Sequence, residues 1–522
     1  MKKTITIIFK YIGKCIYVVI AFAFFSVIYY MKCWNVEFAT ALYQMSSPLK
    51  GTNPEYIIQY IRVAGVPFVL FLFLWYLGWK IVLYLVDESN IFIKIQILSK
   101  QYIWVLKYNF FYLSKRILAI GLSVVAVVYI IIYGNYIGMI EFAKSYTNST
   151  TLFEEYYVSP QDTTILFPTK KKNLLLIYLE SMENTYMSTD VGGGKKINYI
   201  PELTSLAKEN INFSNSNQLG GAINGKLSEW TMAALLGSSC GIPFKMPIGG
   251  NDAENYSDFL PGVIGLGDIL YDNGYKNYFL CGSEASFAGR DIFFKQHGDY
   301  TIYDYDYAVK EGKEDINKRT YWGYDDRKLF QYAKEYLNEI GNDGVPFNFT
   351  MLTVDTHHPD GYLCELCKDQ YNEQYANVLA CSSKQVAEFV NWVQEQPWYE
   401  DTVIVLIGDH LSMNTNFWSD IGNYQRCIYN CFINTDKDIN NIDVIHNRVF
   451  CSFDFFPTIL SAMSVEIEGH CLGLGVDLFS NEQTLYEKFG TENLNQQLIG
   501  YSKYYMEEFV QNRTRDRRKR KC

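Results

Sequence analysis

Short, continuous apolar runs alternate with segments of helical periodicity throughout the carboxyl-terminal part of the chain. Four such runs predict β-strands: N-L-L-L-I-Y-L-E (173–180), K-N-Y-F-L-C (276–281), F-N-F-T-M-L-T-V (347–354) and T-V-I-V-L-I-G (402–408). Apolar positions at helical spacing predict helices at 201–210, 228–236, 324–340 and 383–396. Apolar strands separated by helices indicate a largely parallel sheet with helices on both faces. Ligands of such sheets bind beyond the carboxyl ends of the strands.

Three longer apolar runs near the amino terminus are typical of membrane spans, at 15–31, 63–86 and 117–140. A span requires about 20 apolar residues, which the second and third runs supply and the first barely reaches. Lys and Arg are concentrated before the first run and between the second and third. This distribution predicts that the amino terminus is cytoplasmic and that everything after residue 140 lies outside the cytoplasm.

The segment 91–107, between the second and third runs, combines apolar residues with spaced lysines. This composition favours a helix lying in the membrane interface. If the segment crossed the membrane instead, the predicted orientation would invert.

The charge of the chain is mildly acidic overall and uneven along its length. There are 46 basic and 56 acidic side chains, a net charge of −10, which gives no argument for binding nucleic acid. Residues 141–172 form a polar connector that ends in three lysines, and the last ten residues are almost wholly basic. Such a tail is either a solvated, mobile end or a contact with anionic lipid headgroups.

Three of the 12 cysteines, Cys364, Cys367 and Cys381, lie near one another in the sequence. Outside the cytoplasm, a disulfide to Cys381 is one interpretation of this spacing. A zinc knuckle built on Cys364-x-x-Cys367 is the alternative, although no second pair of cysteines has the matching spacing.

Acidic and imidazole side chains follow three of the four predicted strands. Glu180 ends the first strand, Asp355, His357 and His358 follow the third, and Asp409-His410 follow the fourth. Buried carboxylates without partners are costly, so acids gathered at one sheet edge require a cation. A carboxylate with an Asp-His pair suits a divalent metal, Mn²⁺ or Mg²⁺ for its oxygens and also Zn²⁺ for its imidazole. Alternatively, each acid separately caps the following helix.

A hydroxyl nucleophile beside such a metal is available in the segment 225–244. Ser228 and Thr231 lie one turn apart at the start of a predicted helix. There, the helix amino terminus favours negative charge and a bound metal lowers the pKa of a hydroxyl. An ordinary helix cap is the alternative interpretation of the same residues.

Six sequence blocks together resemble one known family. The chain is similar to the sulfatase-like branch of the alkaline phosphatase superfamily, and within it to membrane phosphoglycerol transferases that act on periplasmic glucans, relatives of the lipoteichoic acid synthases. The blocks lie between about residues 170 and 480 in the expected order: Y-L-E-S-M-E-N-T-Y (178–186), L-L-G-S-S-C-G-I-P (235–243), F-A-G-R-D-I-F-F-K-Q-H-G (287–298), L-T-V-D-T-H-H-P-D-G (352–361), D-T-V-I-V-L-I-G-D-H-L-S-M-N (401–414) and L-G-L-G (472–475).

The resemblance implies an organisation in which a membrane anchor precedes one catalytic domain in a bacterial inner membrane. An all-α transmembrane anchor of about three helices would occupy 1–140, followed by a linker at 141–172. An extracytoplasmic sulfatase-like α/β domain would occupy 173–480, with a mixed, mostly parallel sheet sandwiched by helices. Residues 481–522 would be a tail with a basic end.

The resemblance also implies a metal site and a nucleophile. Glu180, Asp409 and His410 match the family's metal ligands, usually of manganese. Its nucleophile is a Thr in a pattern T-x-x-[ST] counted back from G-I-P, and here that count falls on Ser228, with Thr231 at the last position. Ser228 is the favoured nucleophile and Thr231 the alternative, and either would also contact the metal.

Further positions match residues that hold the lipid phosphate, namely Arg290 and His357. His357 or His358 is expected to act as the general acid for the leaving oxygen. A Trp that is usual two residues before the Arg in lipoteichoic acid synthases is Ala288 here, which favours the glucan branch.

The implied activity is metal-dependent transfer of phosphoglycerol from phosphatidylglycerol to a glycan through a covalent Ser/Thr intermediate, with release of diacylglycerol. A phosphoethanolamine transferase or a hydrolase of the same fold is an alternative. A true sulfatase requires C-x-P-x-R or S-x-P-x-R, and S-E-W-T-M has neither the Pro nor the Arg. An alternative of another class is a non-catalytic membrane protein that binds glycan or lipid.

Overall fold

The computed structural model describes most of the carboxyl-terminal part of the chain. The described residues are 148–245, 258–437 and 442–511, together with 54–87, 91–97, 100–106 and scattered positions between 18 and 38 and between 135 and 143. Contacts divide the chain into two units, Met1–Met45 with Pro54–Lys144, and Ser46–Asn53 with Ser145–Cys522. Each unit is described by itself.

The amino-terminal unit contains a long apolar helical segment. Helix α3 (Pro54–Tyr60) continues through a π-helical turn, Ile61–Gly65, into α4 (Val66–Asp87). Among the described residues, Tyr56–Gly78 is long and apolar enough to cross a membrane, with 23 residues and a mean hydropathy of 2.0. It overlaps the predicted second span. Within the first span residues 21–29 are helical, whereas the third lies almost entirely outside the described residues, so an anchor of three helices stays a prediction.

The segment 91–107 does not form the expected interfacial helix. Strands β1 (Ile91–Ile97) and β2 (Lys100–Leu106) pair as an antiparallel hairpin. The run I-F-I-K-I-Q-I places isoleucine at every second position. This is the period of a strand, and β-branched residues favour it.

A six-stranded mixed sheet lies at the centre of the carboxyl-terminal unit. All neighbouring strands are parallel except the last pair, in which β9 runs antiparallel to β8. The predicted strands are confirmed within two residues at their ends, and two short edge strands, β6 and β9, were not predicted. The order is β6 (Thr301–Tyr303), β5 (Lys276–Cys281), β7 (Phe347–Leu352), β4 (Asn173–Leu179), β8 (Thr402–Gly408), β9 (Asn430–Ile433).

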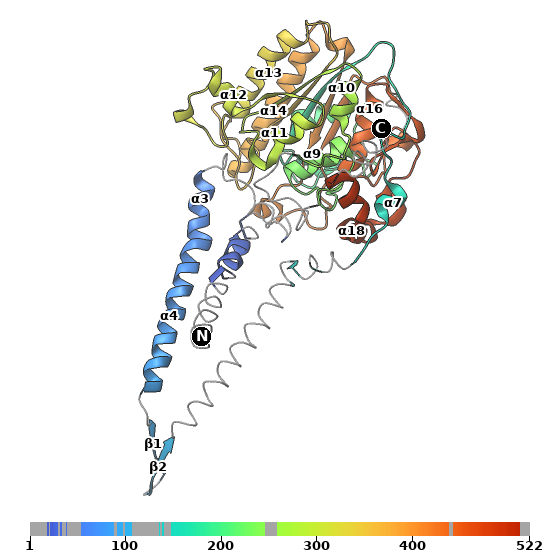
Figure 1. Ribbon diagram of the computed structural model, residues 1–522. Helices are drawn as coiled ribbons and strands as arrows, with labels where there is room; N and C mark the ends of the chain where they lie inside the picture. Colours follow the sequence, from blue (N-terminus) through green and yellow to red (C-terminus); the bar gives the residue numbers. More distant parts are fainter. Residues whose placement is uncertain are drawn as a thin grey trace. The chain divides into compact units, whose positions relative to one another are not determined.

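Helices cover both faces of this sheet (Figure 1). On one face, Leu175, Ile177 and Leu179 of β4 are buried in a core shared with α8 (Pro201–Glu209), α13 (Asp326–Ile340) and α14 (Gln374–Gln394). The intervening Tyr178 points to the opposite face, where its hydroxyl lies 2.7 Å from Ser238 Oγ. That face is covered by α9 (Thr231–Cys240), α10 (Leu266–Asp272) and α16 (Ser452–Ala462). The strand alternation therefore places β4 between two helical layers.

Segments from both ends of this unit pair with one another. Strand β3 (Ile165–Leu166) is antiparallel to β10 (Glu466–Ile467), and Tyr501 N donates to Asn148 O at 2.7 Å. The domain boundaries predicted at 172 and 480 stay predictions.

The other α-helices and strands described in this unit are α7 (Leu152–Tyr156), α11 (Arg290–Gln296), α12 (Tyr305–Lys310), α15 (Ile442–Ile445), β11 (Cys471–Leu472), β12 (Gly475–Val476), α17 (Leu485–Phe489) and α18 (Thr491–Ile499).

Candidate active site

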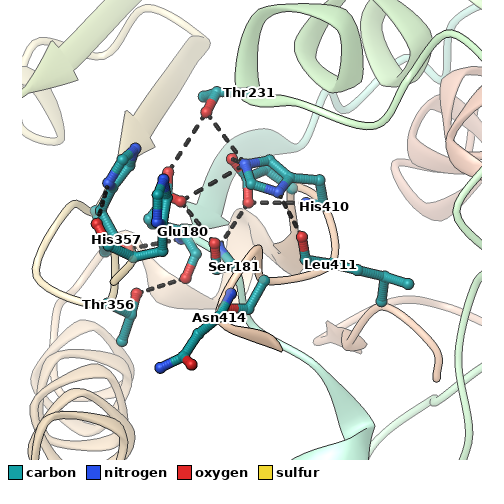
Figure 2. Close-up of polar contacts among 12 residues, drawn as sticks. Glu180, Ser181, Thr231, Thr356, His357, His410, Leu411 and Asn414 are labelled. Atoms are coloured by element: carbon teal, nitrogen blue, oxygen red, sulfur yellow. Dashed lines mark hydrogen bonds and ion pairs between the residues drawn. The ribbon is translucent and has the colours of Figure 1, made fainter. Parts of the chain in front are cut away.

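Three neighbouring strands bring the predicted site residues to one edge of the sheet. Strand β4 lies between β7 and β8, and all three are parallel, so their carboxyl ends meet. Glu180 follows β4, and Asp409 and His410 follow β8. One ligand atom from each of these three buried residues lies within 4.8 Å of the others. The structure therefore brings together the three residues that the sequence selects as metal ligands; Figure 2 shows Glu180 and His410 of this group.

A close backbone contact holds the two ligand-bearing turns together. Gly408, the last residue of β8, lies so near Met182 that a Cβ added to it would be 1.9 Å from the Met182 carbonyl oxygen. Any larger residue would therefore clash with backbone. The absent side chain lets the turn after β4 and the turn after β8 meet at main-chain distance.

The carboxylate of Asp409 has one satisfied and one unsatisfied oxygen. Its Oδ1 accepts the backbone N–H groups of Ser181 at 2.7 Å and of His410 at 2.8 Å. Its Oδ2 is buried and has no hydrogen-bond partner within the described ranges of the chain. Burial and the charge of Glu180 raise the pKa of Asp409 to about 7. An unpaired buried carboxylate oxygen at this position fits the coordination of a cation.

The imidazole of His410 is held in the tautomer that can bind a metal. Its Nδ1 lies 2.9 Å from the carbonyl oxygen of Leu411, which can only accept, so Nδ1 carries the proton. Its Nε2, the nitrogen left to bind a metal, lies 3.4 Å from Asp409 Oδ2 and 3.6 Å from Glu180 Oε1. Burial lowers the pKa of His410, but the charges of Asp409 and Glu180 outweigh this effect and raise it. A backbone carbonyl that fixes the ring in this way is usual behind metal-binding histidines.

Hydroxyl groups that the sequence analysis did not select hold Glu180 in place. Ser181 Oγ donates to Glu180 Oε1 at 2.7 Å, and the backbone N–H of Glu180 donates to Thr353 Oγ1 at 2.9 Å. Thr356 Oγ1 donates to the Glu180 carbonyl. Their position in the sequence could have identified these hydroxyl residues, because all three lie in the same strand-end motifs as the acids and the histidines.

The structure brings Thr231, and not the favoured Ser228, to the acid and imidazole cluster. Thr231 is the first residue of α9, and its Oγ1 lies 3.4 Å from Glu180 Oε2 and 3.4 Å from His410 Nε2 (Figure 2). Ser228 precedes the helix, which begins three residues later than predicted, and its hydroxyl donates to Gly225 O at 2.6 Å. No recorded contact between described residues joins Ser228 to the cluster. We therefore propose Thr231, in place of Ser228, as the nucleophile and metal contact.

Arg290 and His357 share the electrostatic environment of this cluster. The guanidinium of Arg290, at the start of α11, donates to Ser283 Oγ at 3.0 Å and to Glu284 O at 2.9 Å. Burial lowers the pKa of His357 to about 4, with a further lowering from His410 and Arg290. Burial also lowers the pKa of His358, to about 2. Both imidazoles are therefore neutral near pH 7.

Two carboxylates and an imidazole around a common point, with a helix amino terminus and a hydroxyl beside them, form the candidate site of this α/β domain. The sequence model of the family described as Sulfatase matches residues 172–465, which is more than half of the chain. The chain belongs to the sulfatase family.

Curated relatives and solved structures resemble this part of the chain. A protein named phosphoglycerol transferase I, from Salmonella paratyphi B, is 38% identical over 283 residues, which are 52% of this chain and 35% of the relative. The match thus spans about a third of the relative's length. The lipoteichoic acid synthase LtaP from Listeria monocytogenes matches with 19% identity and a TM-score of 0.47, over 63% of this chain and 80% of that one. The lipooligosaccharide phosphoethanolamine transferase EptA from Neisseria meningitidis matches with 13% identity and a TM-score of 0.48, over 85% and 83%.

Proposed function

We propose that the chain transfers the phosphoglycerol headgroup of phosphatidylglycerol to an extracytoplasmic glycan and releases diacylglycerol. The observation that carries the proposal is the hydroxyl of Thr231 at the start of α9, 3.4 Å from both a Glu180 oxygen and the His410 Nε2. The 38% identical relatives named phosphoglycerol transferase I support the choice of headgroup. Because only about a third of their length is matched, donor, acceptor and activity all belong to the proposal.

Glu180, Asp409 and His410 would hold a divalent cation, and we propose Mn²⁺, with Mg²⁺ or Zn²⁺ as alternatives. The unpaired Oδ2 of Asp409 and the Nε2 of His410 are both suited to such an ion. Carboxylate oxygens suit Mn²⁺ and Mg²⁺, whereas the imidazole also admits Zn²⁺. When bound, the cation supplies positive charge that lowers the pKa of a neighbouring hydroxyl and neutralises phosphoryl oxygens.

In the first step, Thr231 Oγ1 attacks the phosphorus of phosphatidylglycerol. Its hydroxyl proton points towards Glu180 Oε2 before the attack. A bond forms between Thr231 Oγ1 and phosphorus while the bond from phosphorus to the diacylglycerol oxygen breaks, and that oxygen takes up a proton. The products are diacylglycerol and a phosphoglycerol ester of Thr231. The amino terminus of α9 favours the negative charge that develops at Thr231.

In the second step, a sugar hydroxyl attacks the phosphorus of this ester. A bond forms between the sugar oxygen and phosphorus while the bond to Thr231 Oγ1 breaks. The sugar hydroxyl gives up its proton, Thr231 Oγ1 takes up one, and the glycan carries the phosphoglycerol. Arg290 neutralises charge on the transferred group, which is most of the catalysis that phosphoryl transfer requires.

The neutral state of His357 changes the role that the sequence suggested for it. Its Nδ1 donates to the carbonyl oxygen of His358 at 2.9 Å, which leaves Nε2 as an acceptor. With a pKa of about 4, His357 has no proton to give at Nε2 near pH 7. We therefore do not propose His357 or His358 as the general acid. Instead, we propose that His357 accepts a hydrogen bond from a glycerol or sugar hydroxyl.

The headgroup is tested with full-length protein in vesicles that contain Mn²⁺, an oligosaccharide acceptor and one labelled lipid. With phosphatidylglycerol labelled in its headgroup, we expect label on the glycan and an equal amount of diacylglycerol. Transfer from headgroup-labelled phosphatidylethanolamine instead would identify an ethanolamine phosphate transferase. Free glycerophosphate without labelled glycan would identify a hydrolase, and no metal-dependent release of label would leave a non-catalytic binding protein.

The membrane arrangement is part of the same proposal. Residues 1–140 would anchor the protein in a bacterial inner membrane in several passes, and the linker 141–172 would keep the site outside the cytoplasm near the donor headgroups. Confinement near the membrane raises the effective concentration of a lipid substrate. A phosphatase reporter fused after residue 145 is expected to be active, and a fluorescent reporter that matures only in the cytoplasm is expected to be dark at the same position. The reverse pattern would place the site in the cytoplasm.

A further inference from the structure

Three cysteine sulfurs converge between the loop after β7 and helix α14. Cys364 and Cys367 lie in the loop, and Cys381 lies in α14. The Sγ atom of Cys364 is 3.7 Å from that of Cys367 and 3.8 Å from that of Cys381, and no disulfide joins them. All three sulfurs lie within 4.8 Å of one another.

These separations fit thiolates around a common ion. A bonded sulfur pair is separated by about 2.05 Å. Thiolates at the corners of a tetrahedral zinc site, each about 2.3 Å from the metal, are separated by about 3.8 Å. The two recorded distances from Cys364 agree with the second geometry within about 0.1 Å.

The segment from Cys364 to Cys367 is a closed turn, and a buried carboxyl group lies near it. The backbone N–H of Cys367 donates to the carbonyl oxygen of Cys364 at 3.1 Å. Both carboxylate oxygens of the buried Asp355 lack a hydrogen-bond partner among the residues that the structure covers.

A fourth donor faces the same sulfurs from the next turn of α14. The terminal amide nitrogen of Gln385 lies 3.4 Å from Cys381 Sγ and 3.8 Å from Cys364 Sγ. Its Oε1 is buried without a hydrogen-bond partner in the described part of the chain. Amide oxygen and nitrogen are assigned from their contacts, so the amide turned over by half a rotation places Oε1 against the sulfurs. In that orientation Oε1 faces the sulfurs of Cys364 and Cys381, where it would be the fourth ligand of an ion held by the cysteines.

We propose that Cys364, Cys367, Cys381 and Gln385 form a structural zinc site, distinct from the Glu180 cluster. Zinc would fasten the loop after β7 to α14. That same loop begins with the segment that carries His357, which is hydrogen-bonded through its carbonyl to Tyr321 at 2.8 Å and lies beside Trp322, with ring centroids 5.1 Å apart. The site would thus support the loop from its far end and take no part in the reaction.

The test uses the full-length protein in which Co²⁺ has replaced the bound metal. Thiolate ligands give Co²⁺ a charge-transfer absorption in the near ultraviolet that oxygen and nitrogen ligands do not give. The Glu180 cluster contains no sulfur, so this band reports on the cysteines alone, whatever the outcome of the transferase assays. We expect the band, together with about one zinc per chain in the untreated protein that remains after mild chelation.

The substitution Cys381→Ser is expected to abolish the band and to remove that zinc, whereas Cys471→Ser, at a half-buried cysteine outside the cluster, should retain both. Gln385→Ala removes only the fourth donor and is expected to weaken zinc affinity about ten- to a hundredfold while the band persists. Failure of Cys381→Ser to fold would leave Gln385→Ala and the metal count as the decisive measurements. An unreduced chain lighter by two hydrogens, with two of the three cysteines resistant to alkylation, would show a disulfide and overturn the proposal, as would a band unchanged in Cys381→Ser.

Discussion

Replacing Thr231 by alanine is expected to reduce phosphoglycerol transfer by about three orders of magnitude or more, as loss of a covalent nucleophile does in other enzymes. The reason is geometric, because the Thr231 hydroxyl is the one that lies 3.4 Å from both Glu180 and His410. Initial rates of label transfer from phosphatidylglycerol measure the effect. Mass spectrometry of the wild-type protein after incubation with the donor alone should find a glycerophosphate ester on the peptide that contains Thr231.

Ser228→Ala is the matched control, because it removes a hydroxyl from the same segment, three residues before Thr231. Its hydroxyl contacts Gly225 O, so the variant should keep transfer within about tenfold and lose about 1 kcal/mol of folding stability, the worth of one buried hydrogen bond. Thr231→Ser keeps a hydroxyl at the site and should retain activity. An inactive Ser228→Ala with an active Thr231→Ala, or an ester found on Ser228, would return the nucleophile to the position that the sequence favoured.

The substitution Asp409→Asn is expected to weaken binding of Mn²⁺ by at least about a hundredfold, because it removes a buried anionic ligand. The folded state should survive, since a buried, uncompensated carboxylate destabilises a protein and its neutral amide does not. Calorimetric titration of the metal-free protein measures the affinity, and thermal unfolding without metal separates loss of binding from loss of fold. Asp401→Asn, at the opposite end of β8, makes the same chemical change at an exposed residue and should bind Mn²⁺ normally.

The same titration should depend on pH in a defined direction. Burial and Glu180 raise the pKa of Asp409 to about 7, so below pH 7 a proton occupies the carboxylate that the cation needs. Release of one proton on binding predicts an affinity that falls about tenfold for each pH unit below 7 and levels off above it. An affinity that is flat between pH 6 and pH 8, or a wild-type affinity for Asp409→Asn, would remove Asp409 from the set of ligands.

The central sheet and the acid cluster could be predicted because their signals are local. Short continuous apolar runs rich in β-branched residues, such as 402–408, favour buried strands between helical layers, and parallel strands present their carboxyl ends at one edge. The position of Glu180 and Asp409 directly after such runs therefore predicted their meeting. Short edge strands, Thr301–Tyr303 and Asn430–Ile433, were missed because so few residues carry no periodicity of their own.

The sequence favoured Ser228 because spacing along a chain does not report where a helix begins. Leu227 adopts a left-handed conformation with φ 63° in the turn before Ser228, and the extended Trp230 lies between Ser228 and the first residue of α9. Only from Thr231 onwards does the backbone become helical, which places the hydroxyl of Thr231 at the amino terminus of α9. The sequence likewise did not decide whether Cys381 and Cys364 form a disulfide or share a metal ion. Both arrangements use the same spacing along the chain and differ by less than 2 Å in the distance between the sulfurs.

The missing side chain of Gly408 would affect how selective the proposed metal site is among ions. The backbone of Gly408, at the end of β8, is in close contact with the carbonyl oxygen of Met182, in the turn after β4. This contact sets the distance between Glu180 on one strand and Asp409 and His410 on the next. Ligand side chains can be exchanged without altering that gap, whereas widening it requires the two strands to part. If Glu180, Asp409 and His410 hold a cation, a preference for its radius would belong to this backbone contact, and redesign of the coordinating residues alone would leave it in place.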